Sequence, residues 1–279
     1  MIARVFPRKT NASPDDKLAF FDVPGLYRPV VQKVHVSVTF SGDLENAEEL
    51  ARQWEIVAPV EIGGPALGDP GGDFTPGRYL KKGYVITSRG CPNKCWFCDA
   101  WKREGAIREL PITNGLNVLD SNLLACSKPH VKAVFKMLAK QKGSAEFTGG
   151  LEAARLTWDN VNDLWDLRPK SMFFAYDTPD DLEPLIEAGK KLRYADFTRH
   201  HMKAYVLVGY EKDTLDGAES RLTETWAAGF MPMAMVYHEN TDVEWKRFQR
   251  LWCRPAIIKK RLRQQIFFLG YVFSLSLFI

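Results

Sequence analysis

Most of what this sequence predicts depends on the stretch Tyr84-Val-Ile-Thr-Ser-Arg-Gly-Cys91-Pro-Asn-Lys-Cys95-Trp-Phe-Cys98. It opens with an apolar run that predicts a strand over residues 84–87. The strand leads into a loop whose cysteines have the spacing C-x3-C-x2-C. Such crowded thiols indicate metal ligands rather than a disulfide framework. Three thiolates from one loop can bind three irons of a [4Fe–4S] cubane and leave the fourth iron open to a small molecule.

The length and composition are typical of one large domain with a hydrophobic core and a small additional segment. The chain has 279 residues, of which 46% are hydrophobic and 26% are charged. No run approaches the roughly 20 apolar residues that a membrane-spanning helix needs, and the first residues lack the apolar core of a signal peptide. We therefore expect a cytoplasmic protein. Cys126 and Cys253 are expected to be packed in the core.

The first part of the chain, residues 1–80, is predicted to be an extension of its own. Residues 1–30 show no period and are expected to form an irregular arm. The pattern after them predicts a βαβ unit, with strand, helix and strand over residues 33–40, 44–56 and 60–62. Six glycines and three prolines between Gly63 and Gly77 predict a loop.

From residue 81 to residue 240, strand and helix patterns alternate. This alternation predicts an α/β fold with a parallel layer or an open barrel. The strands are expected at residues 84–87, 117–119, 146–148, 172–176, 204–208 and 231–237. Helices are expected at residues 129–140, in the stretch after Gly149-Gly150, and at residues 180–192 and 215–228.

The cysteine motif, with Phe97 directly before its third cysteine, resembles the signature of the radical S-adenosylmethionine (SAM) superfamily. The resemblance covers roughly Tyr84 to Tyr237 and implies a partial (β/α)6 barrel behind the small βαβ extension. It further implies that Cys91, Cys95 and Cys98 bind a [4Fe–4S] cluster whose open iron is chelated by SAM. Reductive cleavage of SAM would then yield a 5′-deoxyadenosyl radical. Phrases such as GYVITSRGCPNKCWFCDAW and MFFAYDTPDDLEPLIEAGK resemble uncharacterised radical SAM proteins of bacteria and phages.

The same resemblance implies the residues that hold SAM. Gly149-Gly150-Leu-Glu152 resembles the family's Gly-Gly-Glu motif for the methionine amino group, with one residue inserted before the glutamate. The remaining assignments are Phe97 beside the adenine, Arg155 on the carboxylate, Asp177 at the ribose and Gly209 at the adenine.

Two further features near the cofactor follow from the resemblance and from charge. Asp120-Ser121-Asn122 closes the second barrel strand, where relatives place polar residues that face the cofactor. Lys94, inside the cysteine loop, is expected to tune the charge around the cluster.

The cluster would need an external one-electron donor such as flavodoxin or ferredoxin. Residues 241–279 form a basic segment with an apolar tail: eight basic residues and no acid follow from Lys246 onward. These charges suggest nucleic acid or a nucleotide as substrate, or else the solvated face of a last helix. The tail from Ile266 is expected to dock on the core or, alternatively, to touch a membrane surface.

Two alternatives use the same residues differently. A fourth ligand from Cys126 or His130 would complete a tetrahedral zinc site with Cys91, Cys95 and Cys98, in a structural or nucleic-acid-binding module. The βαβ unit that ends in Ile62-Gly-Gly-Pro65 also resembles a fragment of the cobalamin domain of some radical SAM enzymes. It is short and lacks an Asp-x-His-x-x-Gly motif, so we do not expect cobalamin.

Overall fold

The computed structural model describes residues 1–238 and 240–262. It shows an α/β protein whose main sheets are parallel and which divides into two compact units, residues 1–145 and residues from 146 onward. This division differs from the predicted boundaries at residues 80 and 240, which remain predictions. The apolar tail from Ile266 lies outside the described residues.

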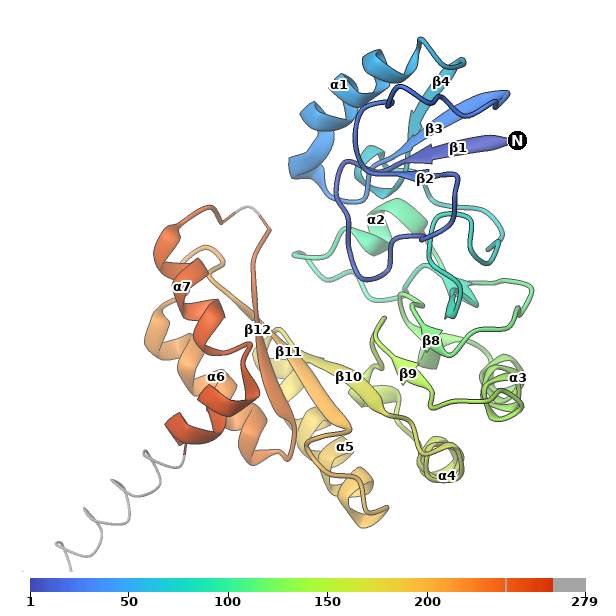
Figure 1. Ribbon diagram of the computed structural model, residues 1–279. Helices are drawn as coiled ribbons and strands as arrows, with labels where there is room; N and C mark the ends of the chain where they lie inside the picture. The colour runs from blue at the N-terminus through green and yellow to red at the C-terminus, as the bar shows by residue number, and fades with distance from the viewer. Residues whose placement is uncertain (239, 263–279) are drawn as a thin grey trace, which may run out of the picture. The chain divides into compact units, whose positions relative to one another are not determined.

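The N-terminal sheet consists of four parallel strands, in the order β2-β1-β3-β4 (Figure 1). The predicted βαβ unit is confirmed, because helix α1 connects β3 to β4. The apolar side of α1 packs on this sheet, where Trp54 is fully buried and its indole nitrogen donates to the carbonyl of Asp22 at 3.0 Å. The bounds are β1 Ile2–Val5, β2 Ala19–Phe20, β3 Lys33–Ser37, α1 Leu44–Trp54 and β4 Val60–Gly63.

The expectation of an irregular arm over residues 1–30 is wrong at two places, because residues 2–5 and 19–20 form strands β1 and β2. Strand β1 occupies an inner position of the sheet, paired with β3 along its whole length, and Ala3 and Val5 are fully buried. A strand of four residues with Arg4 inside it is too short and too polar to show a period. Arg4 is buried but satisfied, since its guanidinium pairs with Asp16 and donates to the carbonyls of Gly77 and Arg78.

The rest of the first unit carries the cysteine loop. Strand β5 (Tyr84–Val85) runs parallel to β8 (Asn117–Val118), while β6 (Ser88–Arg89) and β7 (Arg108–Glu109) form a short antiparallel pair. Its helices are α2 Ala100–Glu104 and α3 Lys128–Ala139.

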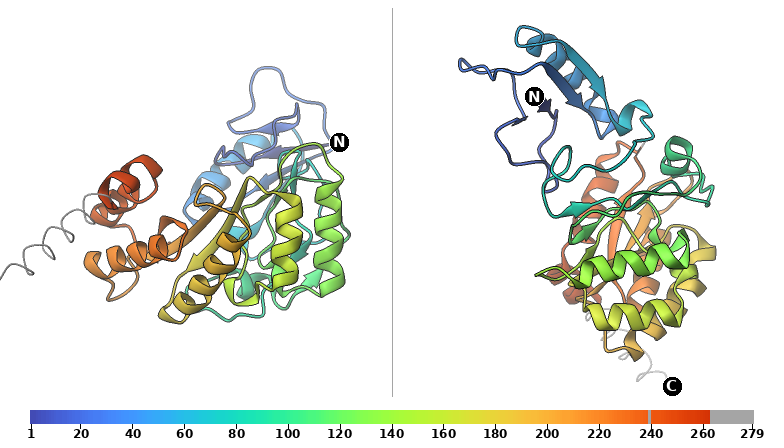
Figure 2. Two further views of the ribbon diagram at one scale, coloured as in Figure 1. Left: turned by 90° about the horizontal axis from the view of Figure 1, so that it is seen from below. Right: turned by 90° about the vertical axis from the view of Figure 1, so that its right-hand side faces the viewer.

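The second unit contains parallel strands joined by helices. Strand β10 lies between β9 and β11, and β12 follows on the other side of β11. Helices α5 and α6 make the successive crossovers from β10 to β11 and from β11 to β12 (Figure 2). The strands are β9 Glu146–Phe147, β10 Ser171–Tyr176, β11 Met202–Val208 and β12 Met231–Val236; the helices are α4 Trp158–Leu167, α5 Leu182–Tyr194, α6 Leu215–Ala227 and α7 Val243–Leu251.

All six strands predicted after residue 81 are present, as are the four predicted helices, with shifts at their ends. Helix α4 is the one expected after Gly149-Gly150. The sequence period did not predict α2 or the short 3-10 turns, because these elements are brief. The 3-10 turns are Ser41–Asp43, Pro65–Leu67, Leu123–Ala125, Ala153–Arg155 and Pro179–Asp181.

The basic segment after β12 is amphipathic where the structure describes it. In and directly after α7, Phe248 and Trp252 are buried, whereas Lys246, Arg247 and Arg250 are exposed. This pattern matches the solvated face of a helix that packs on β12. Within the described part of the chain, no helix is long and apolar enough to span a membrane.

Replacing Val5 tests the inner position of β1. We expect Val5→Asp to lower the free energy of unfolding by about 3 kcal/mol or more, because it buries an unpaired charge. Val30→Asp is the matched control: Val30 is 88% exposed, so we expect a change within about 0.5 kcal/mol. Urea unfolding followed by circular dichroism measures both, and equal small effects would contradict the inner position of β1.

Candidate functional site

The cysteine loop presents three half-exposed thiols between β6 and α2. Cys91, Cys95 and Cys98 are all free, and none is fully buried. Burial raises the pKa of the Cys98 thiol, and the nearby Cys91 raises it further, so these two sulfurs are close enough to interact. Hydrogen bonds from the backbone N–H groups of Ala100 and Trp101 act in the opposite direction.

Backbone contacts fix the path of this loop. The Cys91 amide donates to the Gly105 carbonyl at 3.1 Å, and the Trp101 indole donates to the Cys95 carbonyl at 2.8 Å. Gly90 enters the loop with a φ of 87°, and a Cβ there would collide with the Ala106 carbonyl. Glycine is therefore required at this position.

Glu104, at the end of α2, is a buried carboxylate behind the loop. It accepts hydrogen bonds from the Gly90 amide at 2.8 Å and the Ser121 hydroxyl at 2.6 Å, and it pairs with Arg103 at 2.8 Å. Although burial raises the pKa of Glu104, these donors outweigh that effect and hold it below its ordinary value. Glu104 thus stays ionised and ties the loop to the end of β8.

Asp120 is the second buried carboxylate at this place. It is 1% exposed and accepts from the Thr87 amide at 2.6 Å, the Thr87 hydroxyl at 2.6 Å and the Ser88 hydroxyl at 2.7 Å. Burial raises the pKa of Asp120 despite these donors. The carboxylate joins β8 to the segment that leads into the cysteines.

Asn122 contacts a cysteine directly. Its side-chain nitrogen lies 3.5 Å from the Cys91 sulfur, in hydrogen-bonding geometry. The sequence predicted that the polar residues after β8 face the cofactor. In the structure, Asp120 binds Thr87 and Ser88, Ser121 binds Glu104, and Asn122 binds Cys91.

The donor set of the loop fits a cubane. Across residues 1–238 and 240–262, no three His, Cys, Asp or Glu side chains are placed to hold one metal ion. Thiolates that bind a [4Fe–4S] cluster each bind a separate iron, whereas zinc ligands converge at about 2.3 Å on one ion. Three neighbouring cysteines would supply three thiolate ligands of a cubane.

The zinc alternative draws on residues that have other contacts in the structure. The Cys126 thiol points to the Asn122 carbonyl at 4.0 Å, and burial raises the pKa of Cys126 to about 11. His130 is buried at the start of α3, where its Nδ1 lies 3.7 Å from a Glu109 carboxylate oxygen.

In the second unit, two of the predicted SAM contacts pair with each other. The Arg155 guanidinium lies 2.6 Å from the Glu152 carboxylate, and both residues follow β9. Together they present one positive and one negative group, the complement of an amino acid's ammonium and carboxylate. Gly149 is exposed and Gly150 has a φ of 109°, so the pair forms a turn that favours glycine.

Asp177 follows β10 and points toward β11. Its carboxylate accepts from the Leu207 amide at 3.1 Å. Burial, and then the neighbouring Asp181, raise the pKa of Asp177 to about 7. Asp177 is therefore a carboxyl group that titrates near neutral pH at the carboxyl end of the parallel strands.

Gly209 and Phe97 occupy different surroundings. The Gly209 amide donates to Asp213 at 2.7 Å and its carbonyl accepts from Asn240 at 2.5 Å, so both backbone groups that were expected to meet adenine already have protein partners. Phe97 is half-buried and its ring meets Trp96 edge-on at 5.3 Å. Lys94 is exposed in the same loop.

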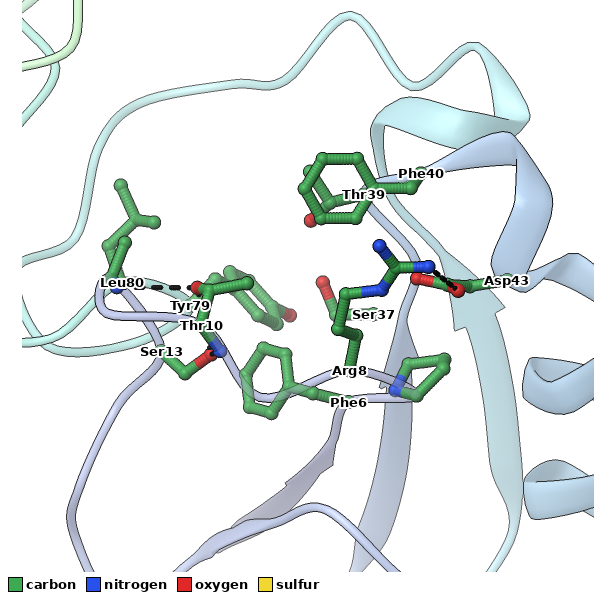
Figure 3. Close-up of a pocket in the computed structure, with 12 residues that line it drawn as sticks. Phe6, Arg8, Thr10, Ser13, Ser37, Thr39, Phe40, Asp43, Tyr79 and Leu80 are labelled. Carbon is green, nitrogen blue, oxygen red and sulfur yellow. Dashed lines mark hydrogen bonds and ion pairs between the residues drawn. The ribbon is translucent and has the colours of Figure 1, made fainter. Parts of the chain in front are cut away.

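A separate hollow lies in the N-terminal sheet, at the carboxyl ends of β1 and β3 (Figure 3). The chain leaves β1 toward β2 and leaves β3 toward β4 on the opposite side, so this is the topological switch point where α/β sheets bind ligands. Arg8 pairs with Asp43 at 2.6 Å and stacks over Phe40. Hydroxyl groups and aromatic rings complete its wall: Thr10, Ser13, Ser37, Thr39, Phe6 and Tyr79.

Sequence reasoning missed Glu104 and the contacts of Asp120 and Asn122. The only visible signal was a run of three polar residues after a predicted strand. Glu104 follows Lys102 and Arg103 in a short helix, where nothing in the sequence marks it as a buried acid.

The fold is similar to that of a solved radical SAM enzyme. The structure of the radical S-adenosylmethionine methyltransferase TsrM from Kitasatospora setae, with cobalamin and a [4Fe–4S] cluster bound, matches with a TM-score of 0.60. The match covers 84% of this chain and 74% of the TsrM chain, at 11% sequence identity, and it establishes a shared fold. No known family profile and no curated protein matches the sequence.

The Asp177 carboxyl makes the stability of the protein depend on pH. Its pKa rises from an ordinary value of 3.8 to about 7 on folding, so the folded state binds the proton more tightly between these values. Stability should therefore fall as pH rises from about 4 to 7, by an amount on the order of 1 kcal/mol per pH unit.

Asp177→Asn tests this, since its amide oxygen can still accept from Leu207 while the ionisable proton is gone. We expect urea unfolding at pH 5, 6, 7 and 8 to show a shallower fall with pH in the variant, and equal or higher stability at pH 8. Parallel pH curves for parent and variant would contradict the raised pKa.

Proposed function

We propose that this protein is a radical SAM enzyme that binds a [4Fe–4S] cluster through Cys91, Cys95 and Cys98. The observation that carries the proposal is the C-x3-C-x2-C loop, placed after a strand and held by three consecutive side chains. The shared fold with TsrM supports it independently of the motif. The finer architecture in the proposal is a six-stranded partial barrel over residues 81–240.

When bound, the cluster would supply the electron that breaks the C5′–S bond of SAM, releasing methionine and a 5′-deoxyadenosyl radical that takes a hydrogen atom from the substrate. The chain's own residues bind and orient. Glu152 and Arg155 would exchange their mutual ion pair for the ammonium and carboxylate of SAM. Asp177 would accept hydrogen bonds from ribose hydroxyls, and Phe97 would pack near the adenine.

Gly149 and Gly150 would let the backbone approach the methionine end of SAM, because neither carries a side chain. Gly209 would contribute by having no side chain, because a Cβ at this position would collide with the Trp245 ring and Asn240. The positive charge of Lys94 would offset part of the negative charge of the cluster and its thiolates.

Partners and substrate belong to the proposal as well. A flavodoxin or ferredoxin would donate the electron. Nucleic acid or a nucleotide remains the proposed substrate class, supported by the exposed basic face of α7. We also propose a cytoplasmic location, where thiols stay reduced.

The first test is anaerobic reconstitution of the full chain with iron and sulfide, followed by dithionite and SAM. We expect cluster absorption and 5′-deoxyadenosine in the parent protein. Cys91→Ala should lose nearly all product because a cluster ligand is missing. Cys253→Ala is the matched control and should behave as the parent, since Cys253 is not part of the C-x3-C-x2-C motif and its thiol donates to the Ala234 carbonyl at 3.3 Å.

The zinc alternative makes the opposite prediction. A protein that binds zinc tightly, gives no cluster absorption and leaves SAM intact would refute the enzyme proposal. Loss of that zinc in Cys126→Ala would then identify the fourth ligand and favour a metal-stapled binding module.

A second candidate function is methyl transfer with cobalamin bound, because TsrM is a methyltransferase whose structure holds cobalamin. One observation favours it: the likeness covers 84% of the chain, more than the predicted barrel alone, so it includes residues outside that barrel. The hollow at the ends of β1 and β3 is at the position where the sheet would bind a ligand. It offers hydroxyl groups, Arg8 and Asp43 but no imidazole among its lining residues.

The nearby histidine has other partners. His35 lies within β3, where its Nδ1 is 2.5 Å from the Tyr79 hydroxyl and its Nε2 is 3.4 Å from Glu61. The residues of the hollow could contact the periphery of a corrin but do not provide a histidine ligand for cobalt. We therefore keep cobalamin out of the primary proposal.

Gel filtration after incubation with hydroxocobalamin separates the two candidates. We expect the cobalamin to elute apart from the protein, with 5′-deoxyadenosine formation independent of it. Co-elution of about one cobalamin per chain, abolished by Ser37→Trp at the wall of the hollow, would favour methyl transfer instead.

A further inference from the structure

We infer that Asn122 is a positioning residue that sets the reduction potential of the cluster, through a hydrogen bond from its side-chain amide to the Cys91 sulfur. This inference rests on the proposed function, because it concerns the cluster that the cysteine loop would hold. It assigns a redox role to a residue that does not itself bind iron.

The geometry makes Asn122 a fixed donor. Its nitrogen is 3.5 Å from the Cys91 sulfur, and the residue is only 5% exposed. The two residues before it are held in turn, Asp120 by Thr87 and Ser88 and Ser121 by Glu104. The backbone that carries Asn122 is therefore anchored to the same loop that carries Cys91.

The chemistry sets the orientation and the sign. A thiolate ligand only accepts hydrogen bonds, so the amide must present its NH2 group to it. Reduction adds one negative charge to the cluster, and a donor at the sulfur stabilises that added charge. Hydrogen bonds to the sulfurs are a principal control of cluster potential, so Asn122 makes the cluster easier to reduce.

The sulfurs of Cys98 and Cys91 receive hydrogen bonds from different kinds of donor. Cys98 receives its hydrogen bonds from the backbone of Ala100 and Trp101. The amide of Cys91 itself donates to the Gly105 carbonyl. At Cys91 the donor is a side chain, which can be replaced without changing the backbone of the loop.

The test is a redox titration of the reconstituted full chain without SAM, followed by electron paramagnetic resonance. At one applied potential we expect the ratio of reduced to oxidised cluster to fall about tenfold in Asn122→Leu, which is about 59 mV for a one-electron couple. Asn122→Asp keeps the shape but loses both donors and adds an acid, so we expect a fall at least as large. Asn46→Leu is the matched control, because the Asn46 side-chain amide donates to the Pro7 carbonyl at 3.1 Å and not to a cysteine sulfur. We expect its ratio to stay within about twofold of the parent.

A second measurement needs no stable leucine variant. Electron–nuclear double resonance of the reduced parent should show an exchangeable proton near the cluster that is missing in Asn122→Asp, while those of Ala100 and Trp101 persist. The inference would be overturned if the ratio of reduced to oxidised cluster were unchanged in both Asn122 variants. It would also be overturned if the parent and Asn122→Asp showed the same exchangeable protons. A parent that forms no cluster would instead overturn the proposed function.

Discussion

The cysteine loop depends on one buried carboxylate. Asp120 is almost fully enclosed and accepts three hydrogen bonds from Thr87 and Ser88, the residues that lead into the loop. A buried carboxylate is costly unless donors surround it, and removing such donors typically costs a few kcal/mol. The requirement for donors therefore holds β8 against the segment before Cys91, and that segment cannot move without leaving Asp120 unsatisfied.

Three consecutive residues after β8 each hold a different part of the loop by hydrogen bonds. Asp120 binds its entrance, Ser121 binds Glu104, and Asn122 binds the first cysteine. Glu104 extends the contact to the Gly90 amide, directly before the cysteines. Catalytic and metal-binding groups work best when the residues behind them are locked by hydrogen bonds. The turn after β8 provides that support from a single short stretch of chain.

The sequence allowed the elements to be predicted because their signals are local. The helical spacing over residues 44–56 and the apolar strand at 172–176 correspond to α1 and β10. Strand β1 could not be predicted in the same way: its burial comes from pairing with β3, 31 residues away at Ile2↔Lys33, and not from its own period. The cysteine motif was evident for the same local reason, whereas its supports were not. Glu104 and Asn122 become important only when folding brings them to Gly90 and Cys91.

Hydrogen-bond donors contact the sulfurs of Cys91 and Cys98, and the charges of the neighbouring helix α2 are paired. The basic residues of α2 are compensated locally, since Lys102 pairs with Asp99 at 3.1 Å and Arg103 pairs with Glu104 at 2.8 Å. Paired charges change the potential at a neighbouring site less than isolated ones, and those at the surface are screened by salt. A buried N–H group keeps its full effect because water does not screen it. An amide at Asn122 would therefore act on a cluster in this loop with little dependence on ionic strength, whereas the effect of an exposed Lys94 would weaken as salt is added.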